Sequence, residues 1–407
     1  MSFEVIKKDV YSRVRTGILH TTHGEVNTPV FLPVGTKGTV KSARNDELKN
    51  WGAEMILANT YHLWLQPGDD LIKKAGGLHR FMGWDGPIFT DSGGFQIFSL
   101  GEKTKRRVNS DEQNPFNVKV KESGVSFQSG LNGQKMELTP EESVGVQNNL
   151  GSDISLVLDE FSGDLNNYER IKKTVERTTR WAKRAKEKFE ELKNAGKLLN
   201  PGQLQLGIVQ GANFPDLRKK SAEEMSALGF EGYCIGGVAV GGETQEKMLG
   251  AIESSILFLE ENKFRHLLGV GTPENIVQAV ARGCDSFDCV IPTREARHGK
   301  VYVSAYCKSP RSWRFAVGNG YQTLDIAKSE FKGDLKPLDK NCNCFACQNH
   351  SRAYLHHLFK SGEILAIRLL TEHNLRFYLE LMAKIRKAVL EQKFSAMAEN
   401  YKDMTNR

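Results

Sequence analysis

Four short apolar runs decide the fold of this chain: LGIVQ (206–210), GYCIG (232–236), HLLGV (266–270) and FDCVI (287–291). Amphipathic stretches with helical spacing lie between them, at residues 216–228, 244–261 and 274–282. Strands that alternate with helices pair in parallel, because the chain crosses over a helix after each strand. This part of the chain therefore predicts a parallel sheet covered by helices.

Four similar runs precede these: PVFLPV (29–34), EMILA (54–58), PIFT (87–90) and ISLVL (154–158), the last followed by a helix-like stretch at 167–193. Eight strands that alternate with helices predict a closed (β/α)8 TIM barrel, an α/β fold. Residues 96–145 are too long for an ordinary connection and contain VKVKESGVSFQSGLNGQKMEL (118–138), with an Asn-Gly turn at 132–133. They are predicted to be an inserted hairpin segment.

Carboxylates stand at the ends of three of these runs, as Asp91, Asp159 and Asp288. The strand ends of a TIM barrel converge on one mouth, so these acids predict an active site there. Two alternatives remain: Asp91 caps a helix, and Asp159 with Glu160 forms a solvated pair. Asp288 is the strongest indication, because a carboxylate inside an apolar run is costly without a partner.

Composition is that of a globular protein, with 39% hydrophobic and 26% charged residues among 407, which argues against disorder, collagen-like repeats and coiled coils. No signal peptide or membrane-spanning run is recognisable, so a cytoplasmic protein without a membrane partner is predicted. The net charge of +7 is uneven: residues 291–407 hold 20 Lys and Arg against 11 Asp and Glu, whereas residues 1–290 hold 36 against 38. The C-terminal third is therefore the expected side for a polyanion.

Three cysteines, Cys342, Cys344 and Cys347, form a C-x-C-x-x-C cluster, which is typical of a metal site in a reducing compartment. Three thiolates and one further donor make a closed tetrahedral zinc site of the structural kind. Spacing leaves the fourth ligand open, and one alternative for the paired histidines is a role in the core. The candidates are His350, His356, His357 and His373. The predicted domains are a catalytic barrel at 1–300 with the insertion at 96–145, a zinc-binding subdomain with C-terminal helices at 301–395, and a tail at 396–407.

Seven separated motifs, together with the cysteine cluster, resemble the bacterial-type tRNA-guanine transglycosylase family from about residue 3 to residue 389. The motifs are TDSGGFQ (90–96), GIVQG (207–211), GGVAVG (236–241), GVGTPEN (269–275), FDCVIPTREARHG (287–299), SRAYLHHL (351–358) and TEHN (371–374). The resemblance implies a TIM barrel with a C-terminal zinc subdomain, and a homodimer. It also implies a pentosyltransferase of queuosine biosynthesis, which exchanges guanine at wobble position 34 of tRNAs with a GUN anticodon for a 7-deazaguanine base.

The resemblance also implies a role for each matching residue. Asp288 is expected to be the nucleophile and Asp91 the general acid/base, and His373 is expected to complete the zinc site. Base-binding roles are implied for Ser92, Phe95, Asp159, Gln210, Gly237, Val238 and Leu268. RNA contacts are implied for Gly269, Val270, Gly271, Thr272, Pro273, Glu274 and Asn275, and for an anticodon-reading loop of Thr293, Arg294, Glu295, Ala296 and Arg297.

The chemistry of base exchange needs these residue types. Breaking the glycosidic bond leaves positive character at C1′ of the ribose, which a carboxylate can stabilise and then bond, while a second carboxyl group moves the proton of the departing and arriving bases. Guanine presents donors at N1 and its exocyclic amine and an acceptor at O6, which suit a carboxylate and an amide or backbone N–H. Stacking on Phe95 and Leu268 offsets part of the cost of taking the base out of the anticodon.

The chain departs from the family at Phe161, where members that use preQ1 carry a cysteine, whereas Val240 keeps the bacterial form. PreQ1 is therefore the predicted incoming base, with direct insertion of queuine as the alternative. Two other classes are a non-catalytic tRNA-binding subunit, which the presence of both Asp91 and Asp288 disfavours, and an N-glycosidase that hydrolyses the bond.

Overall fold

Eight parallel strands form a barrel in the computed structural model, which describes residues 2–99, 117–161, 163–238, 244–304 and 320–401. Their order is β4-β14-β13-β12-β11-β10-β6-β5. A parallel bridge between Val34 and Leu57 joins the two ends of this sheet, with the N–H of Gly35 donating to the carbonyl of Leu57 at 2.6 Å. The strands are β4 (Val30–Leu32), β5 (Ile56–Ala58), β6 (Ile88–Thr90), β10 (Ile154–Leu156), β11 (Leu204–Val209), β12 (Gly232–Ile235), β13 (Phe264–Leu267) and β14 (Ser286–Asp288). The predicted TIM barrel is confirmed.

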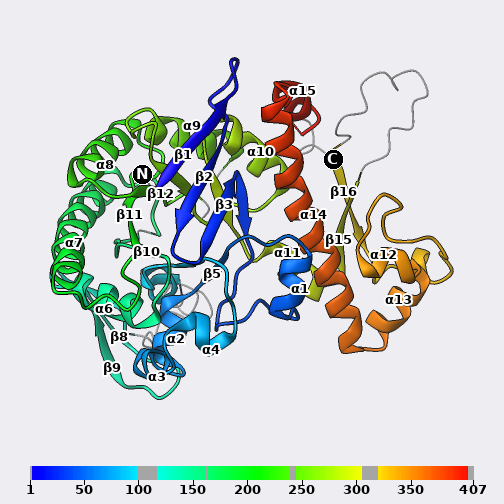
Figure 1. Cartoon of the computed structure of the whole chain (residues 1–407), viewed down its shortest axis with the longest axis horizontal. Coiled ribbons are helices and arrows are strands. Elements are labelled where there is room, and N and C mark those ends of the chain that lie inside the picture. The colour runs from blue at the N-terminus through cyan, green and yellow to red at the C-terminus, as the bar shows by residue number, and fades with distance from the viewer. Residues whose placement is uncertain (1, 100–116, 162, 239–243, 305–319, 402–407) are drawn as a thin grey trace.

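Helices surround the barrel (Figure 1). The four predicted ones are confirmed as α7 (Tyr168–Asn194), α8 (Pro215–Leu228), α9 (Gln245–Ile256) and α10 (Pro273–Ala281). Side chains of Asn167 and Thr244 accept from the backbone at the starts of α7 and α9, which satisfies N–H groups that a helix leaves unpaired. The others here are α1 (Asn45–Asn50), α2 (Thr60–Leu65), α3 (Asp69–Lys74), α4 (Leu78–Met82) and α6 (Pro140–Leu150).

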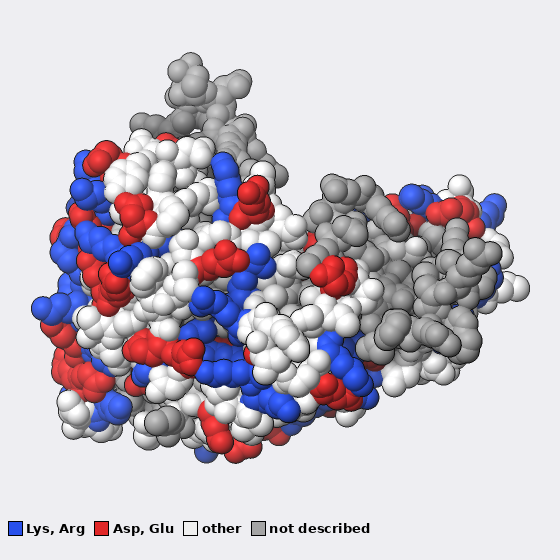
Figure 2. All heavy atoms as spheres, turned by 90° about the horizontal axis from the view of Figure 1, so that it is seen from above, with Lys and Arg blue, Asp and Glu red and all other residues white. Residues whose placement is uncertain are grey.

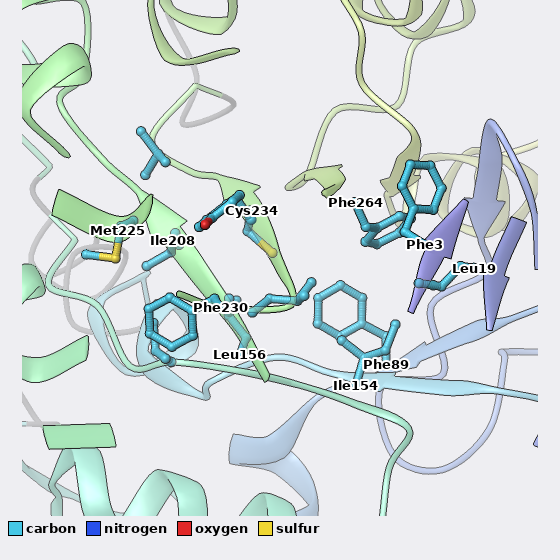
Figure 3. Close-up of a cluster of buried hydrophobic side chains, with 14 of the residues drawn as sticks. Phe3, Leu19, Phe89, Ile154, Leu156, Ile208, Met225, Phe230, Cys234 and Phe264 are labelled. Carbon is cyan, nitrogen blue, oxygen red and sulfur yellow. The ribbon is translucent and has the colours of Figure 1, made fainter. Parts of the chain in front are cut away.

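Buried side chains fill the interior of the barrel (Figure 3). Phe89, Leu156, Ile208 and Cys234 belong to one cluster, and each is at most 2% exposed. A core packed in this way leaves no room for a ligand inside the barrel, so a ligand can bind only at the mouth where the strands end.

An antiparallel sheet that the sequence did not predict covers the end of the barrel where the strands begin. It consists of β1 (Phe3–Lys8), β2 (Arg15–Thr21) and β3 (Gly24–Thr28). Phe3 packs edge to face on Phe264, with ring centroids 5.7 Å apart, and the buried Arg15 makes two hydrogen bonds of 2.8 and 2.6 Å to Asp285. Most of β1 faces solvent, which explains why the sequence has no apolar run at this strand.

The predicted inserted hairpin is confirmed in part. Strands β7 (Lys119–Val120), β8 (Val125–Gln128) and β9 (Lys135–Leu138) form an antiparallel sheet, and Gly133 in the predicted turn has a φ of +71°. Helix α6 begins inside the predicted 96–145 segment and belongs to the barrel wall, because Gln147 donates to the carbonyl of Leu156. Residues 100–116 lie outside the described part of the chain.

The C-terminal region packs beside the barrel and is joined to it by the long helix α14 (Ile364–Leu390) (Figure 1). This helix contacts α11 (Ile291–Arg297) and β4 on one side, and β15 (Lys300–Ser304), α12 (Phe345–Asn349) and α13 (Arg352–Lys360) on the other. Strand β16 (Tyr321–Asp325) pairs with β15, and a short 3-10 helix spans Ser329–Phe331.

The stretch from residue 396, predicted to be a tail, is helical and packed against the protein over its described part. Helix α15 (Phe394–Glu399) buries Phe394 and Met397, and Tyr401 is only 5% exposed. Residues 402–407 lie outside the described part of the chain. Among the described residues, no helix combines the length and apolarity needed to cross a bilayer.

Asp153, directly before β10, ties the barrel to the N-terminal sheet and to α4. Its buried carboxylate accepts from the backbone N–H of Ile88 at 2.8 Å and lies 2.7 Å from Nδ1 of His23 and 3.0 Å from Nε2 of His79. Burial raises the pKa of Asp153, but the hydrogen bonds from His79, His23 and Ile88 outweigh it and leave this pKa below its ordinary value.

We expect Asp153→Asn to destabilise the fold at pH 7 by about 1–3 kcal/mol, because it weakens charge-assisted hydrogen bonds in a buried site. A pKa lowered by folding means that the ionised carboxylate stabilises the folded state above the unfolded-chain pKa of about 3.9, and that this contribution is lost as the pH falls through the folded pKa. Melting curves of both proteins should therefore converge below pH 4. The exposed Asp70→Asn serves as the control, and a Tm difference independent of pH would contradict the assignment.

Candidate active site and metal centre

Asp91, directly after β6, is held by three donors. Its carboxylate accepts from Nδ2 of Asn59 at 2.5 Å, from the backbone N–H of Thr60 at 2.8 Å and from Nε2 of Gln96 at 2.7 Å. The pKa of Asp91 is raised to about 6, mainly by burial. The three hydrogen bonds oppose this rise, and the negative charge of Asp288 adds to it. A carboxyl group with such a pKa can both give and take a proton near neutral pH.

Asp288, the last residue of β14, is held through one oxygen. Its Oδ1 accepts from the backbone N–H of Gly269 at 3.0 Å and lies 3.2 Å from Nε2 of the buried His266. Nδ1 of His266 lies 2.7 Å from Oγ of Ser286, so a Ser286 hydroxyl donor places the ring proton on Nε2, toward Asp288. Among the described residues, no hydrogen bond uses Oδ2 of Asp288, which leaves this oxygen for a ligand at the mouth.

Asp159 lies beyond the end of β10 and is 7% exposed. Its Oδ2 accepts from Nε2 of Gln210 at 2.6 Å. Burial raises the pKa of Asp159 to about 6, and the charges of Asp91 and Glu160 add to this rise, whereas the Gln210 hydrogen bond opposes it. Asp91, Asp159 and Asp288 therefore share one electrostatic neighbourhood at the mouth of the barrel, as the sequence predicted.

The alternative of a solvated Asp159–Glu160 pair is wrong. Glu160 is 1% exposed and forms ion pairs with Arg170 at 2.5 Å and with Arg177 at 2.7 Å, both on α7. These two arginines neutralise Glu160 and fix the loop that carries Asp159.

Phe95 and Leu268 lie at the mouth, and neither is a fully buried core residue. Phe95 is 50% exposed, and its ring meets that of Phe161 edge to face, with centroids 5.5 Å apart. Leu268 is half-buried against the barrel core. Both positions leave apolar surface for a planar ligand. Phe161 enters this wall directly, so its departure from the family pattern bears on the shape of the site.

The glycine turn after β12 approaches Gln210 closely. A side chain at Gly237, whose φ is +67°, would place its Cβ 2.5 Å from Oε1 of Gln210. Val238 is 3% exposed and Ser92 is 3% exposed, with the N–H of Gly94 donating to Oγ of Ser92. The rest of the predicted GGVAVG motif, including Val240, falls in residues 239–243, outside the described part of the chain.

The two predicted RNA-contacting segments are partly buried. In the first, the hydroxyl of Tyr378 donates to the carbonyl of Gly271, and Tyr321 donates to Glu274. Gly269 is exposed, whereas Thr272 and Asn275 are intermediate, and Pro273, Glu274 and Asn275 begin α10. Residues with low exposure are Val270, Gly271, Pro273 and Glu274.

The second segment, predicted to be a loop, is a helix: Thr293–Arg297 lies in α11. Thr293 and Ala296 are buried, Glu295 and Arg297 are intermediate, and Arg294 points outward with 49% of its side chain exposed. On the face drawn in Figure 2, basic and acidic side chains occur in small mixed groups rather than in one basic field. The distribution of charge on that face therefore does not indicate where a tRNA would bind.

The predicted metal ligands come together in the C-terminal region. Sγ of Cys342, Cys344 and Cys347 and Nδ1 or Nε2 of His373 all lie within 4.8 Å of one another, and all four residues are buried. Nδ1 of His373 is 3.6 Å from Sγ of Cys344 and 3.3 Å from Sγ of Cys347. Nε2 of His373 faces the carbonyl of Tyr302 at 2.7 Å, which keeps the proton there and leaves Nδ1 as the donor to a metal.

The other three histidines are placed elsewhere. Nδ1 of His356 lies 2.7 Å from the carbonyl of Ile326, as in a satisfied core histidine, while His357 is exposed and His350 packs beside the ring of Tyr354. Three thiols and one imidazole fit a structural zinc ion, since four protein ligands close the coordination sphere.

Several contacts in the site could not be found from the sequence. His266, Asn59, Thr60 and Gln96 orient the two acids. Asn59 and Thr60 follow a predicted strand and Gln96 ends the TDSGGFQ motif, but the sequence did not show which acid each of them contacts. The ring order of the strands places β13 beside β14 and β5 beside β6, and so brings His266 to Asp288, and Asn59 and Thr60 to Asp91.

The family model described as queuine tRNA-ribosyltransferase matches residues 9–406. Relatives named queuine tRNA-ribosyltransferase from Staphylococcus aureus strains JH9, N315 and MW2 are each 44% identical over 401 residues, which cover 98% of this chain and 96% of theirs. The chain belongs to the queuine tRNA-ribosyltransferase family.

Proposed function

We propose that this enzyme, a tRNA-guanine transglycosylase and thus a pentosyltransferase, exchanges guanine at the wobble position of tRNAs with a GUN anticodon for preQ1. The proposal combines membership of the family with one observation: two carboxylates in different surroundings, Asp91 and Asp288, face one mouth of the barrel. A carboxyl group with a raised pKa beside a second carboxylate, at the mouth where the strands end, is typical of a catalytic site.

Asp288 is the proposed nucleophile. Gly269 and His266 hold Oδ1, so Oδ2 can approach the C1′ atom of the ribose as the bond to guanine breaks. The carbon–oxygen bond forms on the face opposite the departing base, and the bond breaks again when the second base attacks C1′ from the face that guanine left. Two displacements retain the configuration of the sugar.

Asp91 is the proposed general acid/base. With a pKa of about 6, it can donate a proton to the departing guanine and accept one from the arriving base. Asn59, Thr60 and Gln96 keep its carboxylate in place through both steps.

The base lies, in this proposal, between Phe95 and Leu268. Asp159 and Gln210 face its donor edge, and backbone N–H groups of Gly237 and Val238 face O6, with Ser92 lining the site. Gly269 to Asn275 and Thr293 to Arg297 would contact the anticodon around it. Figure 1 shows α10 and α11, which carry these segments, on the side of the barrel that holds α14.

The test is to incubate the protein with a GUN-anticodon tRNA and labelled guanine. Label entering the tRNA supports exchange, abasic tRNA would indicate hydrolysis, and binding without either would indicate a non-catalytic subunit. Competition among guanine, preQ1 and queuine then identifies the incoming base, and preferred incorporation of queuine would replace preQ1 in the proposal. The expected homodimer has twice the 45.6 kDa mass of the chain and is tested by light scattering.

We expect Asp159→Asn to raise KM for guanine about tenfold to a hundredfold, because guanine loses a charged partner for its donor edge. The same change should stabilise the free protein at pH 8. The folded state raises the pKa of Asp159 to about 6, so it favours the protonated acid, and stability is lost as the pH rises through this value. A neutral amide avoids that loss, which is on the order of 1–3 kcal/mol.

Melting curves at pH 5 and pH 8 check this second expectation. The variant should exceed the wild type in Tm at pH 8, and the difference should shrink at pH 5. Asp70→Asn, at an exposed position, is the control. A variant that is less stable than the wild type at pH 8 would contradict the expectation.

A further inference from the structure

Arg218, in the first turns of α8, is a fully buried arginine beside the base site. It is 0% exposed, and its guanidinium donates to four backbone carbonyls at the ends of two neighbouring strands. Nε donates to Ala212 at 2.8 Å, Nη1 to Val209 at 3.1 Å and to Gly236 at 2.8 Å, and Nη2 to Gly237 at 3.3 Å. One side chain thus fixes the loops that follow β11 and β12.

The contacts with Gly236 and Gly237 determine where two N–H groups point. The peptide bonds after these residues are trans, since the cis bonds of the described residues are those before Pro29 and Pro67. In a planar trans peptide the C=O and the N–H point in opposite directions. Because Arg218 draws both carbonyls toward itself, the N–H groups of Gly237 and Val238 point away from it.

These two N–H groups are available to a ligand. Among the described residues, no hydrogen bond uses the N–H of Gly237 or Val238, whereas the N–H of Gly236 donates to the carbonyl of Val209 at 3.0 Å. Gln210 lies directly beside this turn, because a Cβ built on Gly237 would lie 2.5 Å from its Oε1. Consecutive N–H groups that point to one side form a concave donor site suited to an oxygen with partial negative charge.

We propose that Arg218 is a positioning residue that turns the Gly236–Gly237–Val238 peptides so that two N–H groups bind the 6-oxygen of the guanine base. The inference rests on the proposed function, because it needs a guanine-like base in this pocket. Arg218 does not touch the base itself. It sets the direction of the two donors, and removing it allows the glycine turn to rotate.

The chain offers a matched control in Arg265, at the opposite end of the barrel. Arg265 is 5% exposed, and its guanidinium also donates to backbone carbonyls, those of Leu259 and Glu260, each at 3.1 Å. Arg218 and Arg265 are therefore alike in burial and bonding, and only Arg218 adjoins the base site. A general loss of stability should follow from changing either one.

The experiment compares the wild type with Arg218→Met, Arg218→Lys and Arg265→Lys in incorporation of labelled guanine into tRNA. For Arg218→Met we expect KM for guanine to rise about tenfold to a hundredfold, the effect of one or two lost hydrogen bonds, while KM for tRNA and kcat at saturating guanine change less than about threefold. Arg218→Lys, which keeps the charge and some donors, should fold and show an intermediate rise. Arg265→Lys should lower Tm and leave KM for guanine unchanged.

Two results would overturn the inference: a wild-type KM for guanine in folded Arg218→Lys and Arg218→Met, or an equal rise of this KM in Arg265→Lys. If Arg218→Met does not fold, the KM of Arg218→Lys for guanine alone tests the inference. A wild-type protein that incorporates no guanine would instead refute the proposed function, so the two failures are distinguishable in one assay.

Discussion

Asp288→Asn should abolish the covalent protein–RNA adduct that survives denaturation, and it should reduce the exchange rate by about 10⁴-fold or more, as removal of a nucleophile does in other enzymes. An amide accepts the N–H of Gly269 as the carboxylate does, so the fold and the affinity for tRNA should be retained. The measurement is a denaturing gel of protein incubated with tRNA and guanine, beside single-turnover exchange rates.

Asp91→Asn provides the comparison for that experiment. It removes the proton carrier and leaves Asp288 in place, so slow adduct formation should persist where Asp288→Asn shows none. An adduct of normal yield in Asp288→Asn would remove Asp288 from the proposed role, whatever the exchange rate.

His373→Ala should release zinc and unfold the C-terminal region. Binding of a structural zinc ion in small peptides provides about 10–16 kcal/mol of apparent free energy, so loss of one of four ligands is a large perturbation. His373 lies on α14, and the next residue, Asn374, donates to the carbonyls of Pro292 and Lys300. The damage should therefore reach α11, which carries the proposed anticodon contacts.

Metal analysis and melting curves check this expectation, with His350→Ala as the control. His350 was an equal candidate by spacing but packs beside Tyr354, so its removal should keep the full zinc content and nearly the wild-type Tm. Zinc retained in His373→Ala and lost in His350→Ala would reverse the ligand assignment. Cys344→Ala should behave as His373→Ala does, because Cys344 belongs to the same cluster.

The sequence predicted the barrel because each buried strand corresponds to a short apolar run, and most of these runs are followed by a longer amphipathic stretch that forms a helix. It missed β1, β2 and β3; most positions of β1 and β3 face solvent, which hides their strand pattern. The resemblance implied a loop at Thr293–Arg297, although these residues form a helical turn after Pro292. A helix was expected after residue 391, but the burial of α15 was not, because its apolar residues are few and the sequence does not show what they contact.

The acids of the site were visible in the sequence, but their surroundings were not. Whether Glu160 is solvated or neutralised depends on arginines 10 and 17 residues away on α7, and the orientation of Asp288 depends on His266 from the neighbouring strand. The choice of His373 over three other histidines came from the resemblance, since spacing carried no information about which ring faces the thiols.

The N-terminal sheet covers one end of the barrel, where Phe3 packs on Phe264, and both belong with Leu19 and Phe89 to one buried cluster (Figure 3). In the proposed reaction, guanine and the incoming base would therefore both pass through the mouth at the other end, which the tRNA would face as well. Guanine would then have to leave before the second base arrives, while the intact RNA chain stays bonded to Asp288 through its ribose.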